Sequence, residues 1–397
     1  EQDVAAHAIL ECQEFWDSRD SICPPVPQPF DFISLIYALA HESVVRQAPD
    51  GRLSVLLNGD GSTDPGAADP ASMGNVICWL LAGGGGTQAT RSTGVDSFHA
   101  ARNAASSTLR DAVEKQYRYI IMSCPRASGT FSHRIDCKQI WSETVYMLPP
   151  FLVLQAPSGE WSHIYDFDAQ DFKRKAWWGV GNGWACCGIV RVLGMLVRPQ
   201  AAETSRNNVD RRFELSRTIA GNAANMPLIR QCGSILLLTL RACLKHMRPD
   251  GLFHDILDDR STFVETNLPQ MLAYTIFCLA LLRRHASGFQ LSGPCYLPEL
   301  GDDEMNGWLH TAEQMRKVAA VGKRDGWGFA RDVCGSPRFD KAGTVAEGQA
   351  WAMMMEVART EWRLVRSRVP PIESGLFSSS EPSVRLVRYP VVAVIDV

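Results

Sequence analysis

A short pattern of glycine, aromatic and acidic residues recurs along this chain, and the recurrence constrains the fold more than any other feature. Residues 129–133 (Gly-Thr-Phe-Ser-His) are followed by Glu143, and residues 251–254 (Gly-Leu-Phe-His) are followed by Glu265. The phenylalanine precedes the glutamate by 12 residues in both copies. Weaker copies begin at Gly159 and Gly326. Each copy is typical of an aromatic loop that leads into a helix, so the chain is predicted to stack repeated supersecondary units.

The segments between the copies are long and apolar, as in residues 234–244 and 271–283, and favour helical hairpins. We therefore predict an all-α fold in which helical hairpins form a ring, an α/α-toroid, with the aromatic loops gathered at one end. Residues 1–366 are expected to form this single domain. Residues 367–397 contain prolines, serines and an apolar run at 391–395, and are predicted to be an extended tail packed on the domain.

Helices outside the repeats are predicted from the spacing of apolar residues. They cover residues 3–20, 31–47, 72–81 and 97–122. Asp31 is expected to cap the second of these helices. Loops are predicted where the sequence is polar or rich in glycine, over residues 58–72, 83–97 and 198–227.

The overall composition excludes several classes of protein. A net charge of -3 without a basic block excludes a nucleic-acid interface. The longest apolar runs, such as residues 235–238, are far shorter than the roughly 20 residues of a membrane helix. The 12 cysteines show no CxxC spacing, so neither zinc nor another cofactor is expected. The oligomeric state is left open.

The chain begins at Glu1 without a methionine, which favours a secreted protein whose leader has been removed. One or two disulfides, involving Cys12, Cys23, Cys124 or Cys137, would be consistent with secretion. The sequence contains no N-x-S/T glycosylation site, which would have been a further marker of secretion.

Three tryptophans and three glycines lie together in residues 177–184, directly before the apolar run 185–195. Such a loop at the start of a buried helix suits the stacking of a sugar. Asn182 is expected to cap a helix that starts near Trp184. The structural alternative is a tight turn with its tryptophans in the core, and Cys186 and Cys187 are expected to be small apolar fillers.

Four segments together resemble the six-hairpin glycosidases, in particular the unsaturated glucuronyl and rhamnogalacturonyl hydrolases and their fungal relatives. Residues 178–185 match the W-x-x-G-N-G-W-A stretch of that family, and residues 141–152 match W-x-D-x-x-Y-M-x-x-P-F-L. Residues 251–265 and 333–350 are similar to the fungal branch. The resemblance covers residues 115–360 and implies the same toroid that the repeats predict.

The resemblance also implies a chemistry, from which the chain departs at two positions. Glu143 stands where those hydrolases carry an aspartate that acts as general acid and base. They hydrate the C4=C5 double bond of an unsaturated uronic sugar, and the resulting hemiketal collapses and releases the next sugar. Burial between Trp141 and Tyr146 is expected to raise the pKa of Glu143. Val180 replaces the family's substrate-binding arginine, and Arg134 is the replacement expected from sequence.

The candidate site extends over the aromatic loops. His133 and Asp136 are predicted to join Glu143 in catalysis, and Glu347 is a second candidate acid. The residues predicted to bind substrate are Trp141, Arg134, Tyr146, Met147, Trp161, His163, Trp178, Val180, Asn182, Trp184, Phe253 and His254. Asp166 and Asp168 accompany His163 in the next repeat. The structural alternative for Glu143 is a carboxylate at a helix start, and for each loop histidine it is an ordinary hydrogen-bonded residue.

Three functions remain open on this basis. The first is glycoside hydrolysis of a small or oligomeric uronic-sugar substrate by double-bond hydration. The second is a repurposed biosynthetic enzyme of fungal secondary metabolism, such as a pericyclase of the Diels–Alderase kind that acts on an apolar polyketide or terpenoid. The third is a protein that only binds its ligand. Because Val180 removes a cation while the tryptophans add apolar surface, a neutral apolar ligand is expected to bind better than an acidic disaccharide.

Overall fold

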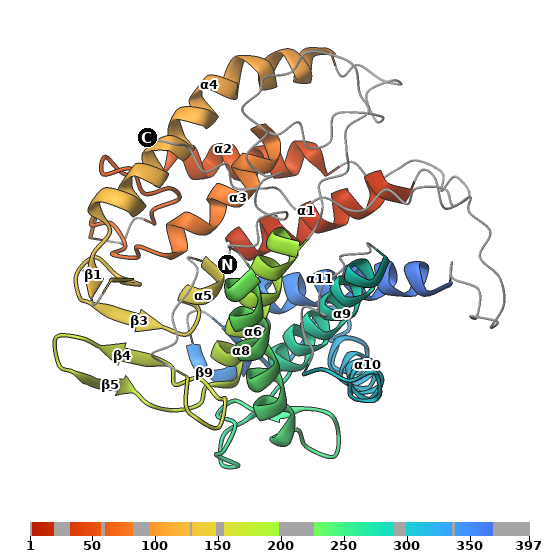
Figure 1. The fold of residues 1–397 in the computed structure, drawn as a ribbon. Helices are drawn as coiled ribbons and strands as arrows, with labels where there is room; N and C mark the ends of the chain where they lie inside the picture. Colours follow the sequence, from red (N-terminus) through yellow and green to blue (C-terminus); the bar gives the residue numbers. More distant parts are fainter. Residues whose placement is uncertain are drawn as a thin grey trace.

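The structure of the protein is a computed structural model (Figure 1). It describes residues 2–19, 32–56, 60–81, 96–127, 129–147, 155–197, 226–288, 299–335 and 338–367. The proposed cap Asp31, most of the loop 83–97, nearly all of the loop 198–227 and almost the whole tail lie outside these ranges.

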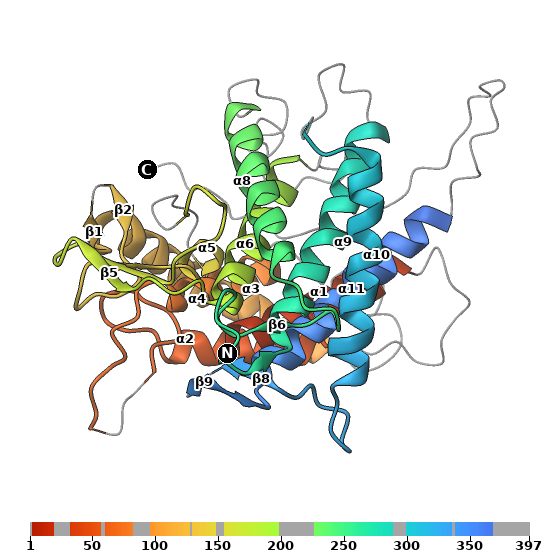
Figure 2. The same ribbon diagram turned by 90° about the horizontal axis from the view of Figure 1, so that it is seen from below.

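Six helices form a closed inner ring, in which each contacts the next and the last returns to the first. These are α1 (Gln2–Arg19), α3 (Asp69–Leu81), α5 (Thr144–Met147), α6 (Gly179–Val197), α9 (Asn267–Gly288) and α11 (Ala346–Ser367). Four further described helices pack outside the ring (Figures 1 and 2). They are α2 (Ile33–Val45), α4 (Asp96–Arg118), α8 (Met226–Lys245) and α10 (Asp302–Arg316). Two of them, α4 and α10, continue into short π-helical turns, Tyr119–Ser123 and Lys317–Gly322. The predicted all-α toroid is confirmed.

Short antiparallel strands connect the outer helices to the inner ones. They are β1 (Arg126–Ala127) with β2 (Thr130–Phe131), β3 (Gln139–Trp141) with β4 (Ile164–Asp166) and β5 (Asp171–Arg174), β6 (Phe253–His254) with β7 (Val264–Glu265), and β8 (Val333–Gly335) with β9 (Arg338–Gly343). Labels in Figure 1 place β1, β3, β4, β5 and β9 on one side of the ring. The loops of the repeats are therefore at the end where the inner helices begin.

A glycine with positive φ marks the turn that precedes an inner helix. The five glycines are Gly51, Gly129, Gly159, Gly251 and Gly328, with φ of 104°, 81°, 111°, 85° and 86°. A side chain at Gly159 would also come within 2.6 Å of the Leu238 carbonyl oxygen, so only glycine fits there. The copy that was predicted to begin at Gly326 has its turn glycine at Gly328, and the copy at Gly51 was not predicted.

The third hairpin is much shorter than the others. Its turn glycines, Gly129 and Gly159, are closer in sequence than any other neighbouring pair of the five. The helix expected after Glu143 is α5, which the structure describes over Thr144–Met147. Pro149 and Pro150 follow Leu148 in the sequence, and proline disfavours the interior of a helix.

The core is continuous through α6 and α9, and the cysteines belong to it. Cys186 and Cys187 are fully buried among apolar side chains, as expected. The prediction of one or two disulfides is wrong for the cysteines that the structure describes, because Cys12, Cys124 and Cys137 are all free thiols.

Two described helices, over Gly179–Leu196 and Pro227–Lys245, have the length and apolar composition of a membrane span. A core helix of a globular protein passes the same test, and 78% and 50% of the two segments are buried inside the protein. They are therefore weak evidence for a membrane protein.

Candidate active site

Glu143 lies at the turn between β3 and α5, where the first inner-helix residues of the third hairpin face the loops. Its Oε2 accepts a hydrogen bond of 3.1 Å from the Ser142 hydroxyl. Its Oε1 lies 3.4 Å from Nε2 of His163, which directly precedes β4. The glutamate is 9% exposed, so it is nearly enclosed by these partners.

The tautomer of His163 follows from its other neighbour. Nη1 of Arg174, at the end of β5, donates to Nδ1 of His163 over 2.9 Å. Because a guanidinium can only donate, Nδ1 is the acceptor and the ring proton lies on Nε2, facing Glu143. Arg174, His163 and Glu143 thus form one row that joins β5, β4 and α5. Among the described residues, no carboxylate forms an ion pair with Arg174.

The charge state of Glu143 differs from the prediction. Burial by itself raises the pKa of its carboxyl, but the neighbouring His163 and His133 outweigh burial and lower the pKa to about 2. The expected rise is therefore wrong. Glu143 is a carboxylate at neutral pH, suited to accept a proton and not to supply one.

His133 connects a second carboxylate, that of Asp69, to the site. Its ring stacks on Trp141 with centroids 4.3 Å apart, and its Nδ1 lies 2.9 Å from the Thr144 hydroxyl. Its Nε2 lies 3.5 Å from Oδ1 of Asp69, the first residue of α3. The Asp69 side chain is 52% exposed, and desolvation by the groups around it raises its pKa. Asp69 was not predicted as a site residue, although it begins an inner helix just as Glu143 directly precedes one.

Two tryptophans flank the histidine of this row. Trp141 meets His163 edge-on at 5.9 Å, and Trp178 lies 4.5 Å from the same ring. The Arg174 guanidinium lies 5.8 Å from the centre of the Trp178 ring. Trp178 also donates its indole N–H to Asp255 over 3.1 Å, and burial raises the pKa of that aspartate. The predicted Trp141 and Trp178 are therefore at the candidate site.

Asn182 joins two loops and leaves no group for a ligand. Its Oδ1 accepts from the Trp161 backbone N–H over 2.7 Å. Its Nδ2 donates to the carbonyl oxygens of Trp161 and Trp178 over 3.0 and 2.9 Å. The residue is fully buried, and the helix it was predicted to cap begins earlier, at Gly179. Asn182 thus positions Trp178 and does not reach a substrate in this structure.

Several other predicted contacts are also enclosed. Trp161, Val180, Trp184 and Phe253 are at most 3% exposed and belong to the main core. Tyr146 lies deeper in the ring, where its hydroxyl is 2.8 Å from Nδ1 of His7 and its ring meets the edge of Trp184. Met147 is half-buried at the end of α5. The expected apolar wall of tryptophans is therefore mostly turned into the protein.

Arg134 and Asp136 form a pair of their own. The guanidinium donates two hydrogen bonds of 2.8 Å to the Asp136 carboxylate, and this pairing holds the pKa of Asp136 below its usual range. The arginine that reaches the pair of His163 and Glu143 is consequently Arg174, through its contact with His163, and not Arg134. A hint was present in residues 173–175 (Lys-Arg-Lys), but the pairing of β4 with β5 is needed to bring Arg174 to His163.

The neighbouring hairpins repeat parts of this arrangement. His254 accepts at Nε2 from Arg248 over 2.9 Å, but Arg248 is also paired with Asp250. Asp166 accepts from the Gln139 amide, and Asp168 is exposed near Lys138. These residues surround the site without contacting Glu143.

The carboxylates of the fourth and fifth repeats serve the framework. Glu265 accepts backbone N–H bonds from Asn267, Leu268 and Cys334, and burial raises its pKa to about 8. Glu347 accepts from the Asn267 amide over 2.8 Å. No cluster of three or more histidine, cysteine, aspartate or glutamate residues suited to a metal occurs in the described ranges.

No known family model and no curated protein matches the sequence. Among solved structures, a family 105 glycoside hydrolase of C. acetobutylicum ATCC 824 is similar over 90% of this chain and 92% of its own, at 13% identity and a TM-score of 0.54. A possible member of that family from Salmonella enterica serovar Paratyphi A is 18% identical, with coverages of 86% and 98% and a TM-score of 0.49.

The unsaturated glucuronyl hydrolase of Bacillus sp. GL1 is 12% identical, with coverages of 91% and 74% and a TM-score of 0.40. At these identities the likeness concerns the fold alone. The clostridial structure shows that this chain has the six-hairpin fold of that glycoside hydrolase.

Proposed function

We propose that this chain, with its six-hairpin fold, is a glycoside hydrolase-like enzyme that hydrates the C4=C5 double bond of an unsaturated uronic sugar. The observation that carries the proposal is the row Arg174–His163–Glu143. A half-buried guanidinium without a carboxylate partner among the described residues needs an anion, and the carboxylate of a uronic sugar supplies one. The base Glu143 lies at the other end of the same row.

Binding of the sugar carboxylate prepares the acid. When Arg174 turns its donors to the substrate, it no longer donates to Nδ1 of His163, and that nitrogen becomes free to take a proton. His163 is then an imidazolium beside the Glu143 carboxylate, which stabilises the positive ring. One substrate contact thereby creates a proton donor and a proton acceptor 3.4 Å apart.

The addition of water then balances. His163 gives its Nε2 proton to C4, and positive charge develops at C5, where the ring oxygen shares it. Water adds to C5 while Glu143 accepts the water proton, and this proton returns to His163. The product is a hemiketal at C5, whose collapse opens the ring and releases the next sugar. No metal or nucleotide takes part in these steps.

The pericyclase alternative has less support. It requires a large apolar wall, but Trp161, Trp184 and Phe253 are enclosed in the core. An apolar ligand would lie against the charged row Arg174–His163–Glu143. It would remove water from Arg174 without supplying an anion, and desolvating an unpaired charge is unfavourable. The preference for a neutral ligand expected from sequence is accordingly withdrawn in favour of an acidic one.

Incubation with an unsaturated uronic disaccharide tests the proposal. Loss of the ultraviolet absorbance of the conjugated double bond, with one molecule of the next sugar released per double bond lost, is the expected result. The matched substrate is the same disaccharide with a saturated uronic acid, which should remain intact. Tight binding of apolar polycyclic compounds with no turnover of the unsaturated disaccharide would contradict the proposal and restore the alternative.

A further inference from the structure

His7 lies on α1, is 3% exposed and contacts two other inner helices. Its Nε2 lies 3.1 Å from the carbonyl oxygen of Ser72 on α3, and its Nδ1 lies 2.8 Å from the hydroxyl of Tyr146 on α5. Ser72 follows Asp69 by three residues, and Tyr146 follows Glu143 by three. His7 therefore joins α3 to α5 about one helical turn from the two carboxylates of the candidate site.

The protons of this connection can be assigned. Burial and the neighbouring Arg191 lower the pKa of His7 to about 4, so the ring is neutral at neutral pH and carries one proton. Because a carbonyl oxygen only accepts, that proton lies on Nε2 and is donated to Ser72. Burial raises the pKa of Tyr146, so its hydroxyl stays protonated and donates to Nδ1. Both ring nitrogens of His7 are thus used, one as donor and one as acceptor.

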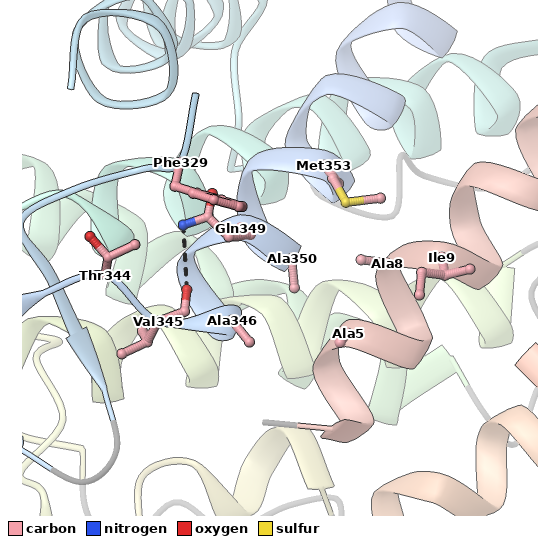
Figure 3. Close-up of a pocket in the computed structure, with 10 residues that line it drawn as sticks. All are labelled: Ala5, Ala8, Ile9, Phe329, Thr344, Val345, Ala346, Gln349, Ala350 and Met353. Atoms are coloured by element: carbon pink, nitrogen blue, oxygen red, sulfur yellow. Dashed lines mark hydrogen bonds between the residues drawn. The ribbon is translucent and has the colours of Figure 1, made fainter. Parts of the chain in front are cut away.

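Helix α1 is a fixed support for His7. Asp3, one turn earlier on the same helix, accepts a hydrogen bond from the Ser72 hydroxyl. On another flank of α1, Ala8 lies opposite Ala350 of α11 (Figure 3). Both alanines are buried, and such small side chains allow two helices to pack closely. The helix is therefore held by α3 and by α11 at the level of His7.

Tyr146 passes the position of His7 on to Glu143. Its backbone N–H donates to the Glu143 carbonyl oxygen over 3.0 Å. Its ring centre lies 4.8 Å from that of Trp184, and the Arg191 guanidinium lies 5.3 Å from the same ring. Because α5 is described as a single turn, an anchor at Tyr146 orients the whole turn that Glu143 precedes.

We infer that His7 is a positioning residue for the proposed reaction: it ties α5 to α3 and so holds Glu143 against His163. The inference rests on the function proposed above, in which these two side chains exchange a proton. They lie 3.4 Å apart, and a misplacement of about 1 Å can cost roughly 100-fold in rate. His7 acts on this distance through Tyr146.

The first test is kinetic and uses the full-length protein with an unsaturated uronic disaccharide. His7→Leu removes both hydrogen bonds, and Tyr146→Phe removes only the hydroxyl, which leaves a second variant to judge if the first does not fold. Each should lower kcat about 10- to 100-fold with little change in KM, because Arg174 still binds the sugar carboxylate. The double variant should be no slower than His7→Leu, since either change breaks the same connection.

A matched control separates positioning from general destabilisation. Leu10 lies on the same helix and is fully buried, but it packs in a second cluster with Ile36 and Ile77. Leu10→Ala should lower Tm and leave kcat unchanged below the unfolding transition. Equal losses of kcat in Leu10→Ala and His7→Leu would overturn the inference, as would full additivity of His7→Leu with Tyr146→Phe.

The second test needs no substrate. His163 and His133 lower the pKa of Glu143 to about 2, so the difference in Tm between the protein and its Glu143→Gln variant should shrink as the pH falls from 4.5 towards 2. Without His7, Glu143 moves away from both histidines and its pKa returns towards 4.5. The same difference, measured between His7→Leu and His7→Leu/Glu143→Gln, should then vary less with pH. An unchanged pH dependence would contradict the inference.

The two tests distinguish failure of the inference from failure of the proposed function. A wild-type protein that leaves the unsaturated disaccharide intact would refute the function, and the pH dependence of Tm then decides whether His7 positions Glu143. An active wild type whose His7→Leu and Tyr146→Phe variants keep their kcat would leave the function standing and overturn the inference alone.

Discussion

Glu143 and Glu265 occupy the same place in two copies of one repeat, and their partners give them opposite properties. Three backbone N–H groups occupy the Glu265 carboxylate, which thereby fixes the start of α9, and burial raises its pKa to about 8. Glu143 instead faces His163 and His133, which lower its pKa to about 2 against the effect of burial. The position in the repeat supplies a carboxylate, and the neighbouring loop decides whether it serves structure or chemistry.

Glu143→Gln should lower turnover of an unsaturated uronic disaccharide at least about 100-fold while KM changes little, because it removes proton transfer and keeps the shape of the side chain. Steady-state kinetics on the ultraviolet signal measure this. Asp136→Asn is the matched control, since Asp136 lies in an exposed pair with Arg134, and should leave turnover unchanged. Equal losses in the two variants would show that Glu143 is a structural residue.

Arg174→Gln should lower kcat/KM about 10- to 100-fold, which is the range expected for the loss of a hydrogen bond to a charged group. Arg134→Gln is the control and should have little effect. The methyl ester of the same disaccharide should lose its dependence on Arg174, because the ester carries no charge. If the acid and the ester respond alike to Arg174→Gln, the arginine does not bind the carboxylate.

The lowered pKa of Glu143 predicts a pH dependence of stability. Because its folded pKa of about 2 lies below its ordinary value of 4.5, the carboxylate stabilises the fold above pH 4.5. This contribution is lost as the pH falls from 4.5 towards 2. The difference in Tm between the wild type and Glu143→Gln should therefore shrink as the pH falls from 4.5 towards 2. A difference that grows on acidification would contradict the assignment.

At the scale of elements, Asn182 shows how the Gly/Trp loop is held. Its amide ties the first turn of α6 to the loop that carries Trp161, and so fixes the position of Trp178 beside His163. Asn182, in the stretch 177–184 that was predicted to stack a sugar, therefore supports the site by positioning Trp178.

Asn182→Ala should destabilise the fold by roughly 2–6 kcal/mol, because it removes the side-chain partner of two buried backbone groups, the N–H and the carbonyl oxygen of Trp161, at about 1–3 kcal/mol each. Thermal unfolding of the variant measures the loss. The control is Asp168→Asn, an exposed loop residue, which should leave Tm unchanged. A small loss for Asn182→Ala would mean that water or a rearranged loop satisfies these groups.

The elements differ in how well the sequence predicts them. Helices α1, α3 and α4 and the repeated turns follow from apolar spacing and from glycine, because both are local signals. Arg174 was missed because it reaches His163 only through the pairing of Ile164 with Arg174 between β4 and β5, a register that the residue pattern does not fix.

At the scale of the molecule, the ring joins the two ends of the described chain. Helix α1 packs between α3 and α11, so the contact of residues 2–19 with residues 346–367 closes the ring. The toroid itself was predictable, because repeats of one kind that bury a common face must stack. The ring was predicted, but the pair of helices that closes it was not, since the contact of α1 with α11 has no counterpart in the sequence repeat.

This closure has a consequence for synthesis on the ribosome. Helix α1 is translated long before α11, the helix that covers its flank, so Ala5, Ala8 and Ile9 face water until residues 346–367 have been made. Nearest-neighbour hairpins can form as they emerge, but α1 must wait with one flank open. The nascent chain is therefore exposed to aggregation between the synthesis of α1 and that of α11, and its yield in cells should depend on chaperones that shield α1.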